Sequence, residues 1–122
     1  MRKRIGSFSG HIIRILDLDI PVGTPIYIAN SNIEHMKSSH PKDFEKYKNE
    51  LQNIITNPDY VGKNSKDNSI EFTKEYFING EYVKVAVRVA KSNIYYARSM
   101  YVLNSNRVKN FIAKGTLKKL DK

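Results

Sequence analysis

The chain has 122 residues, of which 40% are hydrophobic and 11% aromatic, which is enough for one globular domain with its own core. A formal net charge of +9 favours a polyanionic partner such as nucleic acid. The absence of cysteine excludes a disulfide framework and thiolate metal ligation, and no apolar run predicts a membrane span. We therefore expect a single domain over residues 1–122 that does not bind membranes. Its default location is the cytoplasm, unless it is delivered into a target cell.

The first thirty residues are expected to form a flexible lead-in, one short apolar element and a short strand. Residues 1–10 are basic and contain two glycines, which predicts a flexible lead-in. Residues 11–16 are apolar enough for either a strand or a short helix, and periodicity does not separate the two in so short a run. Pro21 and Pro25 predict a turn-rich connection, followed by a short strand over residues 26–28 at the edge of a sheet.

Two helices are predicted next. Ser31 and Glu34 have the spacing of a capping box, so a first helix should begin there and end near Ser39. Pro41 suits the first turn of a second helix, which should end at Asn57 and Pro58. That second helix carries an apolar stripe that should face the sheet: Phe44, Tyr47, Leu51, Ile54 and Ile55.

The second half of the chain predicts a meander of three antiparallel strands over residues 69–78, 81–90 and 94–103. Asn79-Gly80 and Ser92-Asn93 are interpreted as two-residue turns, and turns of that length fix the register of the strands. One face then collects the apolar side chains Ile70, Phe72, Ile78, Val83, Val85, Val87, Val89, Ile94, Tyr96, Met100 and Val102. The other face collects Glu71, Thr73, Glu75, Lys84, Ala86, Arg88, Ala97, Ser99 and Tyr101.

Two cations, Lys74 and Arg98, fall on the apolar face in this register. Either their stems pack on the core while their charged heads reach water, or the two cations are held together where an anion binds. A short strand at residues 60–62 precedes the meander. A last helix should begin at Ser105 and end at Gly115, followed by a solvated tail with Lys118, Lys119 and Lys122. The predicted fold class is α+β, with the helices packed on one face of an antiparallel sheet of about four strands.

Histidine is the side chain best suited to proton transfer near neutral pH, and the chain has three: His11, His35 and His40. His35 and His40 are five residues apart, which is not the spacing of a helical zinc site, and no acidic cluster surrounds them. We expect neither a metal nor another cofactor. Two histidines beside a lysine would suit a reaction that needs a base, an acid and a charge stabiliser. Alternatively, His40 merely caps the second helix while His35 is exposed on the first.

The order His35, His40, Lys74 and then Ser99-Met100-Tyr101 resembles the His, His, Lys, Ser/Thr-x-Tyr signature of EndoU-type endoribonucleases. Residues 25–115 as a whole resemble the phage-associated nucleases of the barnase–EndoU–colicin–RelE superfamily. The resemblance implies a metal-independent ribonuclease with N-terminal helices in front of a four-stranded antiparallel sheet.

The resemblance also implies roles for these residues. His35 and His40 would act as general base and general acid, producing a 2′,3′-cyclic phosphate end and a 5′-hydroxyl end. Lys74 would stabilise charge on the phosphoryl oxygens, while Ser99 and Tyr101 would position the phosphate or a neighbouring base. Further contacts to substrate are expected from four side chains: Thr73, Lys84, Arg88 and Arg98.

The predicted register conflicts with this set, because Lys74 lies on the face opposite Ser99 and Tyr101. Either a β-bulge shifts one strand by a residue, or only a subset is catalytic. One subset is Lys74 and Arg98 with the histidines. The other lies on the polar face and comprises Thr73, Arg88, Ser99 and Tyr101.

The sequence leaves three functions open. The first is an endoribonuclease, as a toxin or a phage-encoded effector, with RNA as partner, tRNA as one candidate substrate, and an acidic immunity or antitoxin protein as inhibitor. The second is a basic RNA-binding module without activity. The third is an interaction protein that binds a host enzyme.

Overall fold

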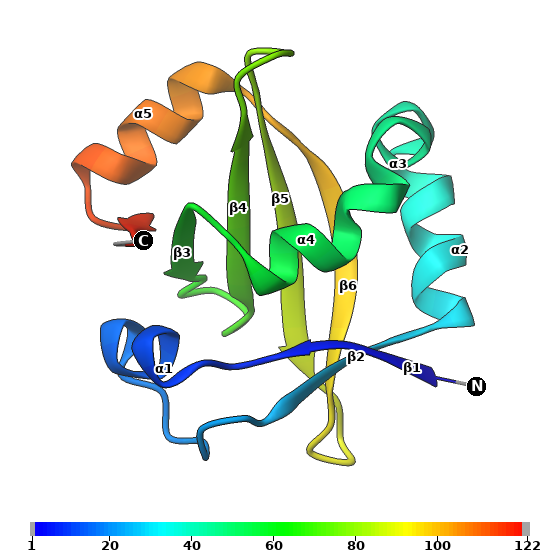
Figure 1. The fold of residues 1–122 in the computed structure, drawn as a ribbon, viewed down its shortest axis with the longest axis vertical. Helices are drawn as coiled ribbons and strands as arrows, with labels where there is room; N and C mark the ends of the chain where they lie inside the picture. Colours follow the sequence, from blue (N-terminus) through cyan, green and yellow to red (C-terminus); the bar gives the residue numbers. More distant parts are fainter. Residues whose placement is uncertain (1, 121–122) are drawn as a thin grey trace.

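A seven-stranded mixed sheet forms the centre of the computed structural model, which describes residues 2–120. Its strand order is β1-β2-β6-β5-β4-β3-β7, and β2 and β6 are the one parallel pair within that range (Figure 1). The strands are β1 (Arg2–Ser7), β2 (Pro25–Ala29), β3 (Tyr60–Lys63), β4 (Ile70–Tyr76), β5 (Glu81–Val89), β6 (Tyr95–Leu103) and β7 (Lys118–Lys119). The α+β class is confirmed, whereas the prediction of an antiparallel sheet of about four strands was wrong, because the sheet is mixed and has seven strands.

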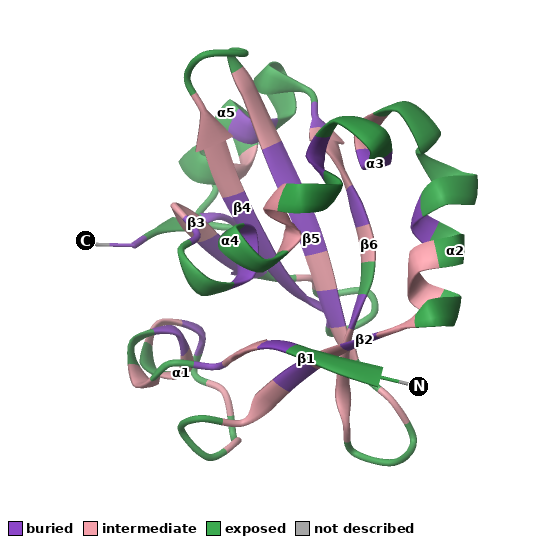
Figure 2. Cartoon of the chain, turned by 45° about the vertical axis from the view of Figure 1, so that its right-hand side comes forward, coloured by how far each residue is buried: buried purple, intermediate pink, exposed green. Residues whose placement is uncertain are grey.

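The helices are α1 (Gly10–Leu16), α2 (Asn30–Ser39), α3 (Pro41–Tyr47), α4 (Leu51–Thr56) and α5 (Ser105–Ala113). Helix α2 packs on β6 and β2, and α4 packs on β1, β4 and β5, so these helices cover one face of the sheet. The buried residues run along the strands beneath them (Figure 2). Alternate residues of the central strands fill this core: Phe72, Val83, Val85, Val87 and Met100.

The N-terminal segment is more regular than predicted. Residues 2–7 form β1 instead of a flexible lead-in, because β1 pairs with β2 and buries Ile5. The ambiguous apolar run is helical: Ser9 caps α1 by accepting a hydrogen bond from the Ile12 amide at 3.2 Å. Strand β2 lies between β1 and β6 and is not an edge strand, so that expectation was also wrong.

The two predicted helices are present, but their boundaries differ. Helix α2 begins one residue early, and Asn32 Oδ1 accepts from the Ala29 amide at 2.8 Å in place of the predicted box of Ser31 and Glu34. The second helix is interrupted after Tyr47 by a 3-10 turn, Lys48–Glu50. The interruption changes the chain direction, so that α3 packs on β6 while α4 reaches β5 and β1.

The meander is confirmed, but both turns are longer than predicted. Tyr76 pairs with Glu81, so residues 77–80 form a four-residue loop, and Ile78 is fully exposed instead of lying on the apolar face. The second turn contains residues 91–93, because the Ala90 amide donates to the Ile94 carbonyl at 2.8 Å. Asn93 adopts the left-handed φ of 64° that this three-residue turn needs.

A β-bulge at Arg98 restores the register of β6. Ala86 pairs with Ser99 and Val87 pairs with Ala97, which leaves Arg98 as the extra residue. The three-residue turn over residues 91–93 shifts the pairing of β5 and β6 by one residue, and the bulge shifts it by one residue in the opposite sense. As a result Ala97 lies in the core and Tyr96 on the other face, the reverse of the prediction, whereas residues 99–103 keep their predicted faces.

The C-terminal segment folds back onto the sheet. Asn104, and not Ser105, caps α5, with its side chain accepting from the Asn106 amide at 2.9 Å. Lys118 and Lys119 were predicted to be in a solvated tail but form β7 against β3. Lys122 lies outside the described residues. No helix in residues 2–120 is long and apolar enough to cross a membrane.

Candidate nucleic-acid cleft

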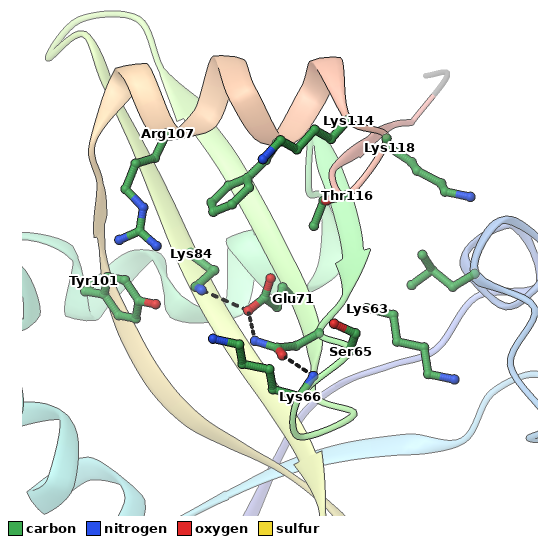
Figure 3. Close-up of a pocket in the computed structure, with 14 residues that line it drawn as sticks. Lys63, Ser65, Lys66, Glu71, Lys84, Tyr101, Arg107, Lys114, Thr116 and Lys118 are labelled. Carbon is green, nitrogen blue, oxygen red and sulfur yellow. Dashed lines mark hydrogen bonds and ion pairs between the residues drawn. The ribbon is translucent and has the colours of Figure 1, made fainter.

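A basic cleft of about 600 Å³ opens on the face of the sheet opposite α4. Its walls are one side of α5 with the turn that follows the helix and the loop of residues 63–69, and Lys84 and Tyr101 form its floor (Figure 3). Among the described residues that line it, Glu71 is the one carboxylate. Six basic side chains oppose it: Lys63, Lys66, Lys84, Arg107, Lys114 and Lys118. An excess of positive charge in a concave site attracts a polyanion.

A second, small apolar cluster holds α5 over this face, so the prediction that the helices pack on one face of the sheet was wrong for α5. Leu103, Val108 and Leu117 are buried together against Tyr60, Tyr82, Tyr101 and Phe111. At the end of the helix Gly115 has a φ of 78°, a conformation that ends α5 and turns the chain back toward β3. Buried contacts therefore hold α5, which forms one wall of the cleft, against the strands that form its floor.

At the floor of the cleft, Lys84 and Glu71 form a nearly buried ion pair. Lys84 Nζ donates to Glu71 Oε2 at 2.8 Å, and the two side chains are only 11% and 10% exposed. Asn64 donates to the same carboxylate oxygen at 3.4 Å. Burial alone would lower the pKa of Lys84, but the hydrogen bonds to Glu71 and Tyr101 outweigh it and raise that pKa. Lys84 therefore stays protonated and positively charged at neutral pH.

His40 reaches the edge of this site because α2 and α3 wrap around β6. The turn between the two helices places His40 against Tyr101, with ring centroids 4.7 Å apart and planes inclined by 25°. The position of α3 is fixed by Asp43, whose Oδ2 accepts from the Val102 amide of β6 at 3.0 Å. Lys84 Nζ in turn lies 4.8 Å from the centre of the Tyr101 ring. Imidazole, phenol and ammonium are thus neighbours.

The bulge in β6 does not bring the predicted set together. Lys74 pairs with Val83 and therefore lies on the face that carries the core, where its Nζ donates to the Asn57 carbonyl at 2.9 Å. Ser99 and Tyr101 lie on the opposite face, opposite Ala86 and Lys84. The geometry gathers His40, Lys84 and Tyr101, and it separates Lys74 from them.

The remaining predicted residues are dispersed. His35 is exposed on α2, with its Nε2 3.4 Å from the Ser39 hydroxyl. Thr73 is fully buried, so its hydroxyl is not open to a substrate. Arg88 is half-buried and pairs with Asp67 at 3.3 Å, and Arg98 is exposed at the bulge.

Sequence reasoning missed several residues of the cleft. Arg107 lies on α5 and Lys114 directly follows its last residue, in a segment that was predicted as a structural helix, and Glu71 was placed on the polar face without a role. A signal existed in this segment, because its basic residues at positions 107 and 114 are two turns apart and so share a side of the helix. Within residues 2–120, no group of three His, Asp or Glu side chains is arranged to hold a metal ion.

A family model described as phage-Barnase-EndoU-ColicinE5/D-RelE like nuclease3 matches residues 3–110. No curated protein and no solved structure matches significantly. The matched range includes His35, His40, Lys74, Ser99 and Tyr101, but the match by itself does not show the EndoU-type pattern. The match spans β1 to α5 and includes most of the basic cleft, so the chain belongs to this family of phage-associated nucleases.

Proposed function

We propose that the protein is an endoribonuclease that cleaves RNA by attack of a ribose 2′-hydroxyl on the adjacent phosphorus. The reaction forms the bond from the 2′-oxygen to phosphorus and breaks the bond from phosphorus to the 5′-oxygen. It leaves a 2′,3′-cyclic phosphate and a 5′-hydroxyl, with the proton of the 2′-hydroxyl taken up by a base and another delivered to the 5′-oxygen by an acid. This chemistry needs proton transfer and positive charge, and it does not need a metal ion.

The observation that carries the proposal is the juxtaposition of His40, Tyr101 and Lys84 beside the basic cleft. His40 is exposed and supplies one of the two proton transfers. Lys84 stabilises the negative charge that develops on the phosphoryl oxygens, in the role that the resemblance gave to Lys74. Tyr101 orients the imidazole through ring stacking and offers its hydroxyl to the phosphate or ribose.

The second proton-transfer group is assigned to His35. His35 is an exposed imidazole on α2, and the assignment rests on the ordered pattern of residues that it shares with His40 and not on its position. The surrounding cations, Arg107, Lys114 and Lys66, bind the phosphates on either side of the cleaved bond. Ser99 lies two residues from Tyr101 on the same face and contacts the same strand of RNA.

The test is cleavage of an unstructured RNA of mixed sequence in the presence of EDTA, with the new ends identified chemically. Loss of one proton-transfer group should slow cleavage by about 10²- to 10⁴-fold, so His40→Ala should be nearly inactive. His11→Ala is the matched control, because His11 is also exposed but lies on α1. Thermal unfolding of each variant shows whether the fold is retained.

Different results separate the parts of the proposal. If folded His40→Ala cleaves as fast as the parent, the assignment of His40 is wrong. If EDTA abolishes cleavage, the metal-independent mechanism is wrong. If His35→Ala retains full activity while His40→Ala does not, the second proton-transfer group is another residue of the cleft.

A further inference from the structure

The face of the sheet that carries Tyr101 continues beyond the cleft into a row of tyrosines and arginines. We propose that this row, which comprises Arg4, Tyr27, Tyr96 and Arg88 and is called here the aromatic track, binds single-stranded RNA next to the cleaved bond. The proposal rests on the proposed function, because it assigns a subsite to the same substrate. It also adds a requirement that the cleft alone does not impose: the RNA must be single-stranded on one side of the cleaved bond.

The pairing of four strands places the track on one face. Ile26 pairs with Tyr95 toward the core, so Tyr27 and Tyr96, which pair with each other, point to the opposite face. Arg4 pairs with Tyr27 on one side, and Arg88 pairs with Tyr96 on the other. The order across β1, β2, β6 and β5 is therefore arginine, tyrosine, tyrosine, arginine.

The side chains of the track are accessible and close together. The rings of Tyr27 and Tyr96 are both half-buried, with centroids 6.5 Å apart and planes inclined by 48°. Arg2, on the same face of β1 as Arg4, extends its guanidinium to 4.8 Å from the centre of the Tyr27 ring. Half-buried rings that are held by a sheet and flanked by cations are suited to stacking bases while the cations bind phosphates.

The track joins the cleft without a change of face. Arg88 is two residues from Ala86 on β5, and Ala86 is two residues from Lys84 in the cleft floor. On the neighbouring side, Asp67 binds Arg88 from the loop of residues 63–69, which is also a wall of the cleft. A strand of RNA that leaves the cleft over β5 would therefore meet Arg88, then Tyr96, and then Tyr27.

The composition of the track favours nucleic acid over an acidic protein as its occupant. An acidic protein would use the arginines, whereas flat aromatic rings at neighbouring positions match the stacking faces of successive bases. The two classes of partner predict different consequences of removing the rings. Replacement of both tyrosines by leucine keeps apolar bulk on the sheet and removes the stacking surface.

The test compares oligonucleotides of two lengths. Binding is measured by fluorescence anisotropy with two labelled probes, a 2′-O-methyl single strand of about 12 nucleotides and the duplex of that strand. The single strand is long enough to leave the cleft, and it is not cleaved because it lacks 2′-hydroxyl groups. Cleavage is measured on an RNA of about four nucleotides, which occupies the cleft alone. The variant Tyr27→Leu/Tyr96→Leu should bind the long strand at least about tenfold more weakly and should cleave the short RNA at the parent rate.

Two control variants, Phe77→Ala and Lys3→Gln, are matched to the tyrosines and to Arg4 of the track. Phe77→Ala removes an aromatic ring that is 82% exposed at the β4–β5 turn and lies outside the track, so it should bind the long strand normally. Arg4→Gln should weaken binding of the long strand and lower its dependence on salt. Lys3→Gln should do neither, because Lys3 lies on the same strand with its side chain on the other face.

The proposal is overturned if the tyrosine variant binds the long strand within twofold of the parent, or if duplex binding falls as much as single-strand binding. It is also overturned if an acidic protein, and no oligonucleotide, binds the track. An equal loss of short-RNA cleavage would assign the tyrosines to the cleft's own structure and would overturn it as well. If the parent binds the long strand through the track but never cleaves RNA, the proposed function fails and the binding site stands.

Discussion

Removal of the Lys84 ammonium separates its structural role from its chemical one. The change Lys84→Met keeps an unbranched chain of similar size in the floor of the cleft and deletes the charge. It leaves the Glu71 carboxylate 10% exposed, with a single remaining hydrogen bond from Asn64 at 3.4 Å. An isolated charge in such a position is costly, so the variant should be destabilised although no apolar contact is lost.

The magnitude follows from the burial of the pair. Removing one partner of a buried ion pair typically lowers the free energy of unfolding by about 3–5 kcal/mol. Because both side chains are slightly exposed here, we expect a loss of about 3 kcal/mol. At about 4 °C per kcal/mol for a domain of this size, the midpoint of thermal unfolding should fall by about 12 °C. The double variant Lys84→Met/Glu71→Gln removes both charges, and it should regain most of this loss.

The assay is thermal unfolding of the parent, Lys84→Met, Glu71→Gln and the double variant, combined with RNA cleavage by each. Stability should recover in the double variant while cleavage does not, since the phosphoryl oxygens still lack the ammonium. A double variant as unstable as Lys84→Met would refute the buried-charge reasoning. Full cleavage by the stable double variant would refute the catalytic role of Lys84 and leave the ion pair as a purely structural feature.

Two further predictions concern the frame around the site. Gly62→Ala should destabilise the protein by about 1–3 kcal/mol, because the added Cβ would collide with the backbone oxygen of Thr116. Gly10→Ala is the control in thermal unfolding, because its Cβ would meet the flexible end of Arg14 and, at ordinary contact distance, the side chain of Val22. Glu81 has a pKa below its ordinary value of 4.5, because its carboxylate accepts hydrogen bonds from Lys46 and Tyr47. The contribution of Glu81 to the free energy of unfolding is therefore present above about pH 4.5 and is lost as the pH falls through the lowered pKa. Urea unfolding of Glu81→Gln should therefore show a stability deficit near neutral pH that disappears in acid, and a deficit that stays constant with pH would contradict this.

The parts of the fold that follow from local side-chain patterns could be predicted from the sequence. The alternating valines of β5 identified the core face of the meander, since each of Val83, Val85 and Val87 is buried as the period of two requires. Pro41 marked the start of α3 for a similar local reason. Strand β1 could not be predicted, because a basic segment becomes a strand only when β2 supplies its hydrogen bonds.

The site was harder to predict because it depends on turn lengths. Asn93 can end a two-residue or a three-residue turn, and the choice inverts the faces of Tyr96 and Ala97. The bulge at Arg98 then inverts the faces again, so Tyr101 was placed correctly although the turn was not. Two errors of one residue cancelled, and this is why the polar face at Tyr101 was predicted while the aromatic track was missed.

The same two irregularities explain how the cleft and the aromatic track come to share a face. With a two-residue turn and no bulge, Tyr96 would lie opposite Val89 on the core face, and the face beyond the cleft would offer Ala97 in its place. The three-residue turn brings Tyr96 out beside Arg88 and Tyr27, and the bulge keeps Tyr101 beside Lys84 and His40. The extra residue itself, Arg98, is exposed at the junction of the two regions. Irregular pairing in β6 is therefore what places the proposed stacking surface and the proposed proton-transfer site on one face of the sheet.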